Sequence, residues 1–405
     1  MNPVAKYFSS LKDYSLSFWI LCLHMLLFFA SFNLLIPEMN SYITSLGGAE
    51  YKWMVLGLWT VAAAVSRPVS GKIADNISRK SVMYFGVLIS VVISFMYPFF
   101  LNVAGFLFLR FLHGFSTGFH PTGASALVAD VIPKGKRGEA MGIFGITITL
   151  GFTSGQAMGS VVKMNFGIEG LFMTCGILGL ISILLIGFIK ENKHTVQQNA
   201  LEKGYHTRWD KMIPKWDEVI GPEVMQPAVI MFLQANIAGV YFLLVPDMSE
   251  HLGFENKGLF FLVNVGVVVV TRFISGKLVD RIGARKNLYV SMSVLAIGCF
   301  VTGSADTGTE FLLSSLIYGF GAAIGSPAIM AWTADLSNPK YKGRGMGTMF
   351  IMLELGFLSG NYFAQLIYDN QPENFYNTFL FGMTLGIIGV GFLIFTRKMP
   401  LQVFN

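Results

Sequence analysis

The sequence predicts an all-α polytopic membrane protein in which twelve transmembrane helices form two related, pseudo-symmetric six-helix bundles. The first observation is composition: 53% of the 405 residues are hydrophobic and only 13% are charged, whereas an ordinary soluble domain is about 25% charged. The second is a series of twelve apolar runs, each near the about 20 residues that cross a membrane. The third is an internal repeat, which is common in membrane proteins of this size.

Short polar breaks that contain Gly or Pro separate the twelve runs. The predicted spans are 16–37, 51–72, 81–101, 104–130, 138–162, 168–189, 226–247, 257–278, 287–304, 309–334, 343–368 and 377–397. The first run is longer than the apolar core of a signal peptide, and neither a small-residue cleavage site nor a soluble domain follows it. We therefore expect it to be a membrane span.

The positions of the basic residues predict the orientation. With both termini inside, 23 of the 29 Lys and Arg residues fall in cytoplasmic segments, which is the positive-inside bias. The exceptions are Lys52, Lys163 and Lys257 in outer loops and Arg67, Arg110 and Arg272 within helices. This bias predicts a multi-pass protein of a bacterial inner (cytoplasmic) membrane. It also accounts for the net charge of +6 without a nucleic-acid partner.

The cysteines and the motif content argue against enzyme chemistry. Cys22, Cys175 and Cys299 each fall in a predicted helix, far apart and without a CxxC or Cys/His spacing, so neither disulfides nor a metal site is predicted. There is no GxSxG, HExxH or Walker sequence and no compact soluble region that could bind ATP. We expect no enzymatic activity and no cofactor, with energy drawn from ion or solute gradients.

The internal repeat has an offset of 205 residues. Segment 106–151 aligns without gaps to 311–356, and the shared residues are not only apolar. They include the pairs Gly114/Gly319, Asp130/Asp335, Gly138/Gly343, Gly142/Gly347 and Gly151/Gly356. The predicted domains are an N-terminal bundle at 1–190, a cytoplasmic linker at 191–225 with a short amphipathic segment, and a C-terminal bundle at 226–405.

The loops after the second and eighth spans carry the same pattern. Its residues are Gly71, Asp75, Arg79 and Lys80 in the first loop and Gly276, Asp280, Arg285 and Lys286 in the second. The pattern resembles the loop signature of the major facilitator superfamily, Gly-x-x-x-Asp followed by a basic pair, and the resemblance covers essentially the whole chain. Ser78 stands where that signature usually has Gly, and Ala284 where it usually has the first basic residue.

This resemblance implies the major facilitator fold and a gate at the inner side. In that gate Asp75 meets the start of helix 11 near Gly343, and by the repeat Asp280 faces the start of helix 5 near Gly138. A carboxylate favours the positive end of a helix. The alternative is that both loops are only basic topology signals.

Two helices resemble elements of the proton-coupled drug and sugar efflux branch of that superfamily. In the fourth helix, Arg110, Gly114 and Gly118 share one face and match an Arg-x-x-x-Gly element, which implies that Arg110 takes part in proton coupling. The alternative is a structural arginine bonded to backbone carbonyls. The fifth helix matches the Gly-x-x-x-Gly-Pro-x-x-Gly-Gly element of drug antiporters, but Gln156 replaces the Pro and Ser160 the last Gly.

Glu354 is the most informative acid outside these motifs. It lies about 11 residues into helix 11, roughly 17 Å deep, and its repeat mate is Thr149. Such an acid is placed to exchange a proton, or it is a structural acid bonded within the bundle. Arg67 and Arg272, one turn before the motif glycines, are interpreted as structural arginines that extend to the inner interface.

Polar and aromatic residues within the spans are candidates for the substrate cavity, although each could instead bridge helices. They are Asn33, His113, His120, Gln156, Asn236, Tyr241 and Trp332. Glu38 and Asp247 follow prolines at the outer ends of helices 1 and 7. We expect them to form an outer gate, an initial cation-attracting site or a pair of solvated helix-end acids.

Together these features predict a monomeric secondary active transporter that exports a small organic solute by alternating access in exchange for protons. Its partners are the small-molecule substrate, protons and the lipid bilayer. Proton symport or facilitated uptake stays open as an alternative, as does a membrane receptor that keeps the fold without transport.

Overall fold

The computed structural model describes residues 14–132, 137–191, 212–214, 219–337 and 342–398. These residues are almost entirely helical, and no strand occurs among them. Most of the predicted linker, including most of its amphipathic segment, lies outside the described residues, so the domain boundaries stay a prediction.

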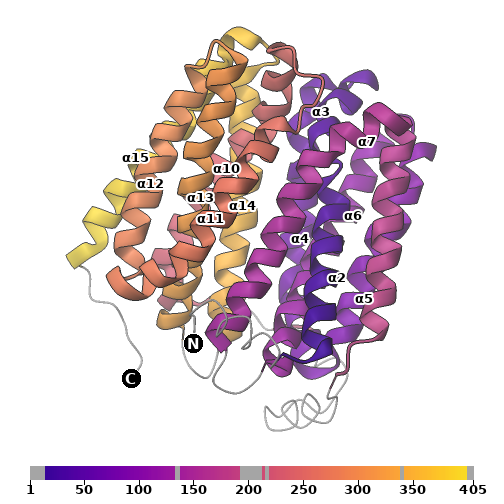
Figure 1. Ribbon diagram of the computed structural model, residues 1–405, viewed down its shortest axis with the longest axis vertical. Helices are drawn as coiled ribbons and strands as arrows, with labels where there is room; N and C mark the ends of the chain where they lie inside the picture. Colours follow the sequence, from indigo (N-terminus) through magenta and orange to yellow (C-terminus); the bar gives the residue numbers. More distant parts are fainter. Residues whose placement is uncertain (1–13, 133–136, 192–211, 215–218, 338–341, 399–405) are drawn as a thin grey trace, which may run out of the picture.

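The helices form two bundles that lie side by side, with the first half of the chain in one and the second half in the other (Figure 1). The first half contains α2 (Leu16–Asn33), α3 (Ile36–Ser45), α4 (Lys52–Asn76), α5 (Arg79–Met96), α6 (Val103–Val131) and α7 (Arg137–Gly187). The second contains α10 (Met225–His251), α11 (Leu259–Ile282), α12 (Ala284–Gly303), α13 (Gly308–Leu336), α14 (Lys342–Tyr368) and α15 (Phe375–Phe395).

The described helices form twelve crossings, as the sequence predicts. Helices α2 and α3 form one crossing that is interrupted by the turn at Leu34 and Leu35. Helix α7 has 51 residues, and Gly167, with φ 72° and ψ −179°, divides it into two crossings. Because a positive φ costs a glycine little, the chain reverses there without strain. Among the described residues nine stretches are apolar and long enough to cross a membrane, and one of these, Ile143–Gly187, contains both crossings of α7.

Side chains at the loop ends fix where several helices begin. The Asn102 carboxamide accepts a hydrogen bond from the Gly105 N–H (2.8 Å) and caps α6. Thr307 and Glu310 form a reciprocal capping box at the start of α13. Ser78 caps α5 through a bond from the Ser81 N–H at 3.1 Å. Each cap satisfies backbone donors that the first helical turn leaves unpaired.

Glycines set the closest helix contacts in both bundles. Gly151, Gly155 and Gly159 follow one face of α7 and lie directly against the backbone of α2. Gly356 and Gly360 do the same on α14 against α10. At each position a Cβ atom would collide with backbone of the facing helix, so these glycines permit a separation that larger residues would prevent.

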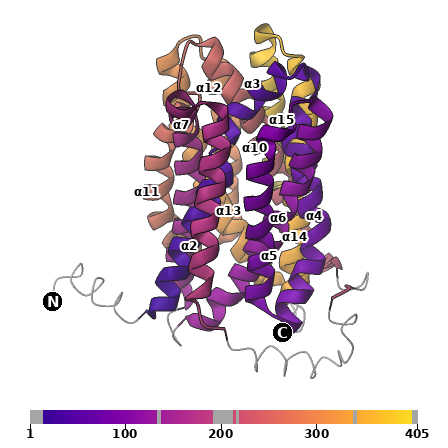
Figure 2. The same cartoon turned by 90° about the vertical axis from the view of Figure 1, so that its right-hand side faces the viewer.

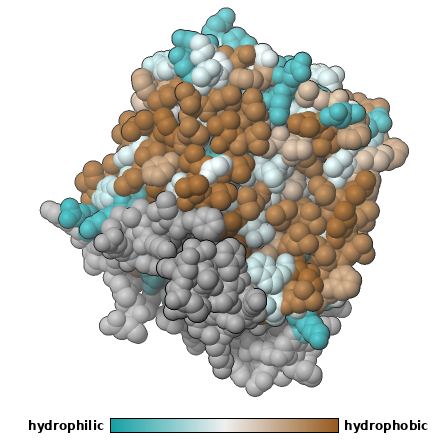
Figure 3. All heavy atoms as spheres, viewed as in Figure 1, coloured by the Kyte–Doolittle hydropathy of each residue, from teal (hydrophilic) through white to brown (hydrophobic). Residues whose placement is uncertain are grey.

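On the face seen in Figure 3, hydrophobic residues cover most of the middle of the molecule, and hydrophilic residues gather at the upper end and at the lower edge of the coloured surface. Large apolar side chains such as Leu184, Phe188 and Ile297 are exposed, as expected where the solvent is lipid. The helices run roughly along one common direction (Figure 2). We name the two ends after the predicted orientation: the inner end carries the α4–α5 turn, and the outer end carries the α3–α4 turn.

Candidate functional site between the two halves

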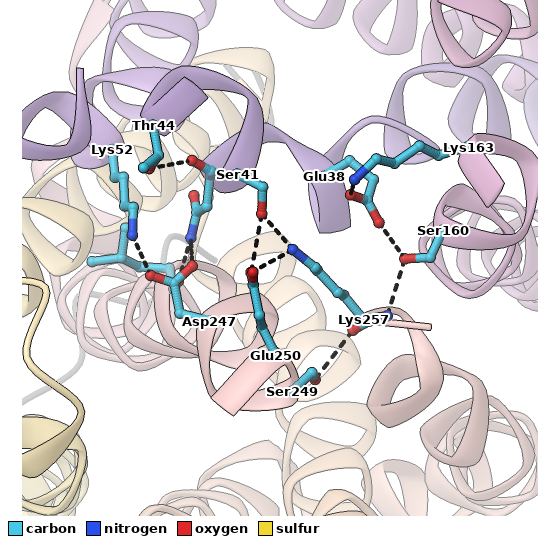
Figure 4. A network of polar contacts seen from close by, with 12 residues as sticks. Glu38, Ser41, Thr44, Lys52, Ser160, Lys163, Asp247, Ser249, Glu250 and Lys257 are labelled. Carbon is cyan, nitrogen blue, oxygen red and sulfur yellow. Dashed lines mark hydrogen bonds and ion pairs between the residues drawn. The ribbon is translucent and has the colours of Figure 1, made fainter. Parts of the chain in front are cut away.

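At the outer end, an ion pair and an amide join α4 and α3 of the first half to α10 of the second (Figure 4). Lys52 Nζ lies 2.5 Å from Asp247 Oδ2, and both side chains are at most 10% exposed. Asn40 Nδ2 donates to Asp247 Oδ1 (2.8 Å) and to the Leu243 carbonyl (2.7 Å). Asp247 is therefore held by groups from the opposite half.

A second polar chain crosses between the halves through Ser160 on α7. Its hydroxyl donates to Glu38 Oε1 (2.6 Å) and accepts from the Lys257 N–H (3.0 Å). Lys163 Nζ lies 2.7 Å from the other oxygen of Glu38, whose side chain is 1% exposed. The Lys257 ammonium contacts Glu250 and Ser41 (Figure 4). Because the side chains of Glu38 and Asp247 are 1% and 8% exposed and each is paired with a lysine, they are not solvated helix-end acids. The network joins the two halves at the outer end.

Below the polar network lies a cluster of apolar residues from both halves. Ile36, Leu56 and Phe242 are its buried members. The Phe242 ring centroid lies 5.7 Å from that of Phe152 on α7 and 5.5 Å from that of Phe357 on α14. Phe242 precedes Asp247 by five residues, or roughly 7.5 Å of helix, so the aromatic contact lies deeper in the molecule than the ion pairs.

The deepest described ionic contact between the halves joins Arg67 on α4 to Glu354 on α14. Arg67 Nη2 and Nε donate to Glu354 Oε1 at 2.5 and 3.0 Å, and the side chains are 13% and 7% exposed. The guanidinium also covers the Phe350 ring at 4.7 Å. Arg67 is therefore directed at the acid of the opposite half, which corrects its interpretation as an arginine that extends to the inner interface.

Arg110 lies apart from Glu354 in a buried network of the first half. Its Nε donates to the Val55 carbonyl (2.9 Å), and its Nη1 donates to the Tyr97 hydroxyl (3.4 Å). The guanidinium lies 5.4 Å from the Trp59 ring centroid. Its partners thus include a backbone carbonyl, and a role in proton coupling for Arg110 stays a prediction.

The two predicted cavity histidines and Tyr241 lie inside the bundles. His113 is placed between Ser90 Oγ and the Tyr97 hydroxyl, both at 3.0 Å. His120 contacts His24, with 2.5 Å between their Nε2 atoms. Tyr241 bonds Thr302 at 2.9 Å and stacks on the Tyr318 ring in the second bundle. These contacts tie helices of one bundle together.

Two of the three predicted amides retain hydrogen-bonding capacity. Asn33 Oδ1 and Gln156 Nε2 are buried and have no hydrogen-bond partner among the described residues. Asn236 Oδ1 accepts from Ser359 Oγ at 3.1 Å. Because buried polar atoms are rarely left unpaired, Asn33 and Gln156 each keep capacity for a further partner, and their role in binding substrate stays a prediction. Trp332 instead lies beneath the Arg285 guanidinium at 5.2 Å.

The loop motif at the inner end involves an acid that sequence reasoning missed. Glu191, just after α7, accepts from the Arg79 N–H (2.5 Å) and from Ser78 Oγ (2.8 Å). Its negative charge there interacts favourably with the positive N-terminal end of α5. Lys80 Nζ donates to the Ile189 carbonyl at 2.7 Å. The only available sequence signal was an acid directly after the sixth span.

The other gate predictions are not tested by these contacts. Asp75 is exposed near the inner end of α4, and its contact with the start of α14 stays a prediction. Gly71 lies in the same helix, with Thr122 as its nearest neighbour. The surroundings of Gly276 and the side chain of Asp280 are not among the parts that the structure describes. Arg285 and Lys286 line a pocket at the inner end of the second bundle.

Comparisons with known proteins agree with this architecture. The family model described as Major Facilitator Superfamily matches residues 18–302 and 228–404. The chain is 25% identical over 390 residues to Multidrug resistance protein 2 of Bacillus subtilis, covering 94% of this chain and 95% of that one. It is 28% identical over 345 residues to the multi-drug resistance efflux pump PmrA of Streptococcus pneumoniae, covering 82% and 83%.

A solved structure shows the same fold. The human organic anion transporter MFSD10 (TETRAN) superposes with a TM-score of 0.70 at 17% identity, over 93% of this chain and 98% of that one. The matches cover nearly the entire chain, and the described helices supply the twelve crossings and the two bundles. The chain therefore belongs to the major facilitator superfamily and is a membrane transporter rather than an enzyme.

Proposed function

We propose that this transporter exports lipophilic organic compounds in exchange for protons and that Glu354 is the proton-exchanging group. The observation that carries the proposal is the buried Arg67–Glu354 ion pair, at 2.5 Å, between α4 and α14 of opposite halves. Protonation of Glu354 removes the negative charge that holds Arg67. A proton therefore acts on a contact that joins the halves, which is what coupling to alternating access requires.

In the proposed transport cycle, the polar network at the outer end is the second contact between the halves that must break and re-form. The Lys52–Asp247 pair and the Glu38–Ser160–Lys257 chain join the halves at the outer end. On this basis we assign the structure to a state in which the outer end is closed and solute exchanges with the cytoplasm. Transport then requires these contacts to open while those at the inner end form. The loop motif with Asp75 is the proposed inner counterpart.

The substrate class follows from the lining of the contact between the halves. Phe152, Phe242 and Phe357 form an aromatic cluster, and the unpaired amide atoms of Asn33 and Gln156 provide a few polar contacts. Sites for small organic molecules combine apolar walls with few polar groups. The names of the bacterial relatives, which refer to multidrug resistance, support the same substrate class and the outward direction.

The energetics are sufficient. One proton crossing a potential of 100 mV releases about 2.3 kcal/mol, which can sustain a solute gradient of roughly fiftyfold. No ATP-binding motif occurs in the sequence, so the proton gradient is the proposed energy source.

The test is proton release from everted vesicles that contain the protein, followed with a pH-sensitive dye during addition of drugs, sugars and metabolites. We expect aromatic, lipophilic compounds to release protons from wild-type vesicles and Glu354→Gln to reduce the rate at least tenfold. Arg110→Ala tests the other predicted coupling residue. The matched control is Thr149→Val at the repeat mate of Glu354, which should stay within twofold of wild type.

Other results would reject the proposal. Proton uptake with the solute would indicate symport, and radiolabelled solute that equilibrates without any proton movement would indicate facilitated diffusion. Unchanged proton release in Glu354→Gln would show that another group carries the proton.

A further inference from the structure

The inner end of the second bundle contains a pocket of about 600 Å³ between α12, α13 and the segment after α15. Its polar lining is mostly basic. Arg285 and Lys286 come from the start of α12, and Arg397 comes from the 3-10 turn Thr396–Lys398. Asp335 is the one acid of the lining, and Tyr289 adds a hydroxyl. Three cations against one carboxylate make this pocket attractive to an anion.

Arg285 is fixed in place by its neighbours. Its Nη2 donates to Gln226 Oε1 (2.9 Å) and to Thr396 Oγ1 (2.8 Å), and its guanidinium lies 5.2 Å from the Trp332 ring centroid. Its Nε is buried and has no hydrogen-bond partner among the described residues. An arginine that is already ordered and has a spare donor binds phosphate oxygens with little further loss of freedom.

A second, apolar groove lies between α12 and α15, about one helical turn farther along each helix than the residues that line the basic pocket. It has a volume of about 420 Å³ and is lined by Ser293, Ile297 and Phe300 of α12 and by Met383 and Ile387 of α15, among others. On α12 these residues follow Lys286 and Tyr289 at intervals of three or four, which places them on one helix face.

On α15, too, the residues that line the pocket and those that line the groove share one helix face. Ile394 lines the basic pocket, and Val390, Ile387 and Met383 line the groove at helical spacing on the same face. From Tyr289 to Phe300 the helix rises roughly 16 Å, about half of the 30 Å hydrocarbon core. The groove therefore extends through the depth of one leaflet.

We propose that an anionic phospholipid of the leaflet at the inner end binds here, with its phosphate on the basic pocket and an acyl chain in the α12–α15 groove. The charge of the pocket selects an anionic headgroup. The groove distinguishes a lipid from a soluble anion, because a soluble anion would gain nothing from apolar walls. The site is on the second bundle alone and does not depend on the proposed transport cycle.

The test is native mass spectrometry of the purified full-length protein with dioleoyl phosphatidylglycerol and, separately, dioleoyl phosphatidylcholine. We expect the anionic lipid to bind at least tenfold more tightly. Each basic residue near an anionic lipid contributes about fivefold in affinity, so Lys286→Gln/Arg397→Gln should weaken phosphatidylglycerol binding at least tenfold. The control is Lys72→Gln/Lys190→Gln, which removes two charges from the inner end of the other bundle and should change affinity less than twofold.

A second variant separates lipid from soluble anion. Ser293 is exposed in the groove, so Ser293→Trp should fill the groove without disturbing the core and weaken phosphatidylglycerol binding at least fivefold. Equal binding of the two lipids, or equal losses in the control variant, would overturn the proposal. If Ser293→Trp has no effect and millimolar inorganic phosphate displaces the lipid, the pocket is a site for soluble anions and the lipid proposal is wrong.

Discussion

The two halves of the molecule share the glycines that pack their helices but differ in the polar groups that those helices carry. Gly151 on α7 and its repeat mate Gly356 on α14 both lie against backbone, of α2 and α10 respectively. Two residues before each, the first half has Thr149 and the second has Glu354. The Thr149 hydroxyl bonds within its own helix, whereas Glu354 reaches Arg67 of the other half.

The outer end shows the same divergence. Glu38 of the first half is paired with Lys163 of its own half. Its counterpart Asp247 is paired with Lys52 of the opposite half, and Tyr368 occupies the position equivalent to Lys163. Close packing depends on shape, which both halves retain, whereas charge has been redistributed so that the ionic contacts differ between them.

The largest effect is expected at the ion pair between the halves. Arg67→Gln leaves Glu354 as a buried acid without its cation, which costs about 3–5 kcal/mol when the charge persists. We expect a large fall in the thermal unfolding temperature of the detergent-purified protein. The double variant Arg67→Gln/Glu354→Gln removes both charges and should recover most of this loss. A double variant no more stable than Arg67→Gln would show that the pair does not connect the halves energetically.

A smaller effect, of the same size in both halves, is expected at the glycine contacts of α7 with α2 and of α14 with α10. Gly155→Val on α7 and Gly360→Val on α14 both force a side chain into facing backbone and should each cost about 1–3 kcal/mol, measured as lowered unfolding temperature. Gly391→Val is the control, because nothing lies within 4 Å of a Cβ at that position. If only one of Gly155→Val and Gly360→Val is destabilised, the repeat-related glycines do not serve the same packing role in the two halves.

The third effect is expected at the serine of the outer network, as a shift between conformations rather than a large loss of stability. Ser160→Ala removes the hydroxyl between Glu38 and the Lys257 N–H, and a hydrogen bond to a charged group contributes about 1.5–3 kcal/mol. We expect a larger open fraction at the outer end, measured by electron paramagnetic resonance distances between labels at Thr44 and Glu255. Ser154→Ala, whose hydroxyl bonds within α7, should leave the distances unchanged. Identical distributions in both variants would remove Ser160 from the gate.

Much of the fold was predictable because it depends on periodic local features. Apolar run length predicted every crossing. The break between the predicted spans 138–162 and 168–189 contains Gly167, whose positive φ divides α7. The glycine-rich element of the fifth helix is visible in the sequence, and its residues Gly151, Gly155 and Gly159 lie at the contact with α2. The candidate site was less predictable, because its residues come from helices far apart in sequence. Arg67 and Glu354 are separated by 287 positions, and no local pattern connects them.

Ser160 illustrates this limit. In the sequence it is only a departure from the glycine of an antiporter element, and it weakens the resemblance. In the structure its hydroxyl joins Glu38 to the backbone of Lys257 across the contact between the halves. The significance of the substitution depends on a neighbour 97 residues away.

By itself the sequence determined that lipid surrounds the helices, how many crossings they make, that the two halves repeat and which family the chain belongs to. Each of these is recorded in local composition, spacing or motif. Only the tertiary structure decided which charges meet. It paired Glu354 with Arg67, placed Glu38 and Asp247 in a polar network that joins the halves at the outer end, and placed a basic pocket and an apolar groove along the same two helices. An ion pair is decided by distances of a few ångströms between side chains, and only the packing of the two bundles sets those distances.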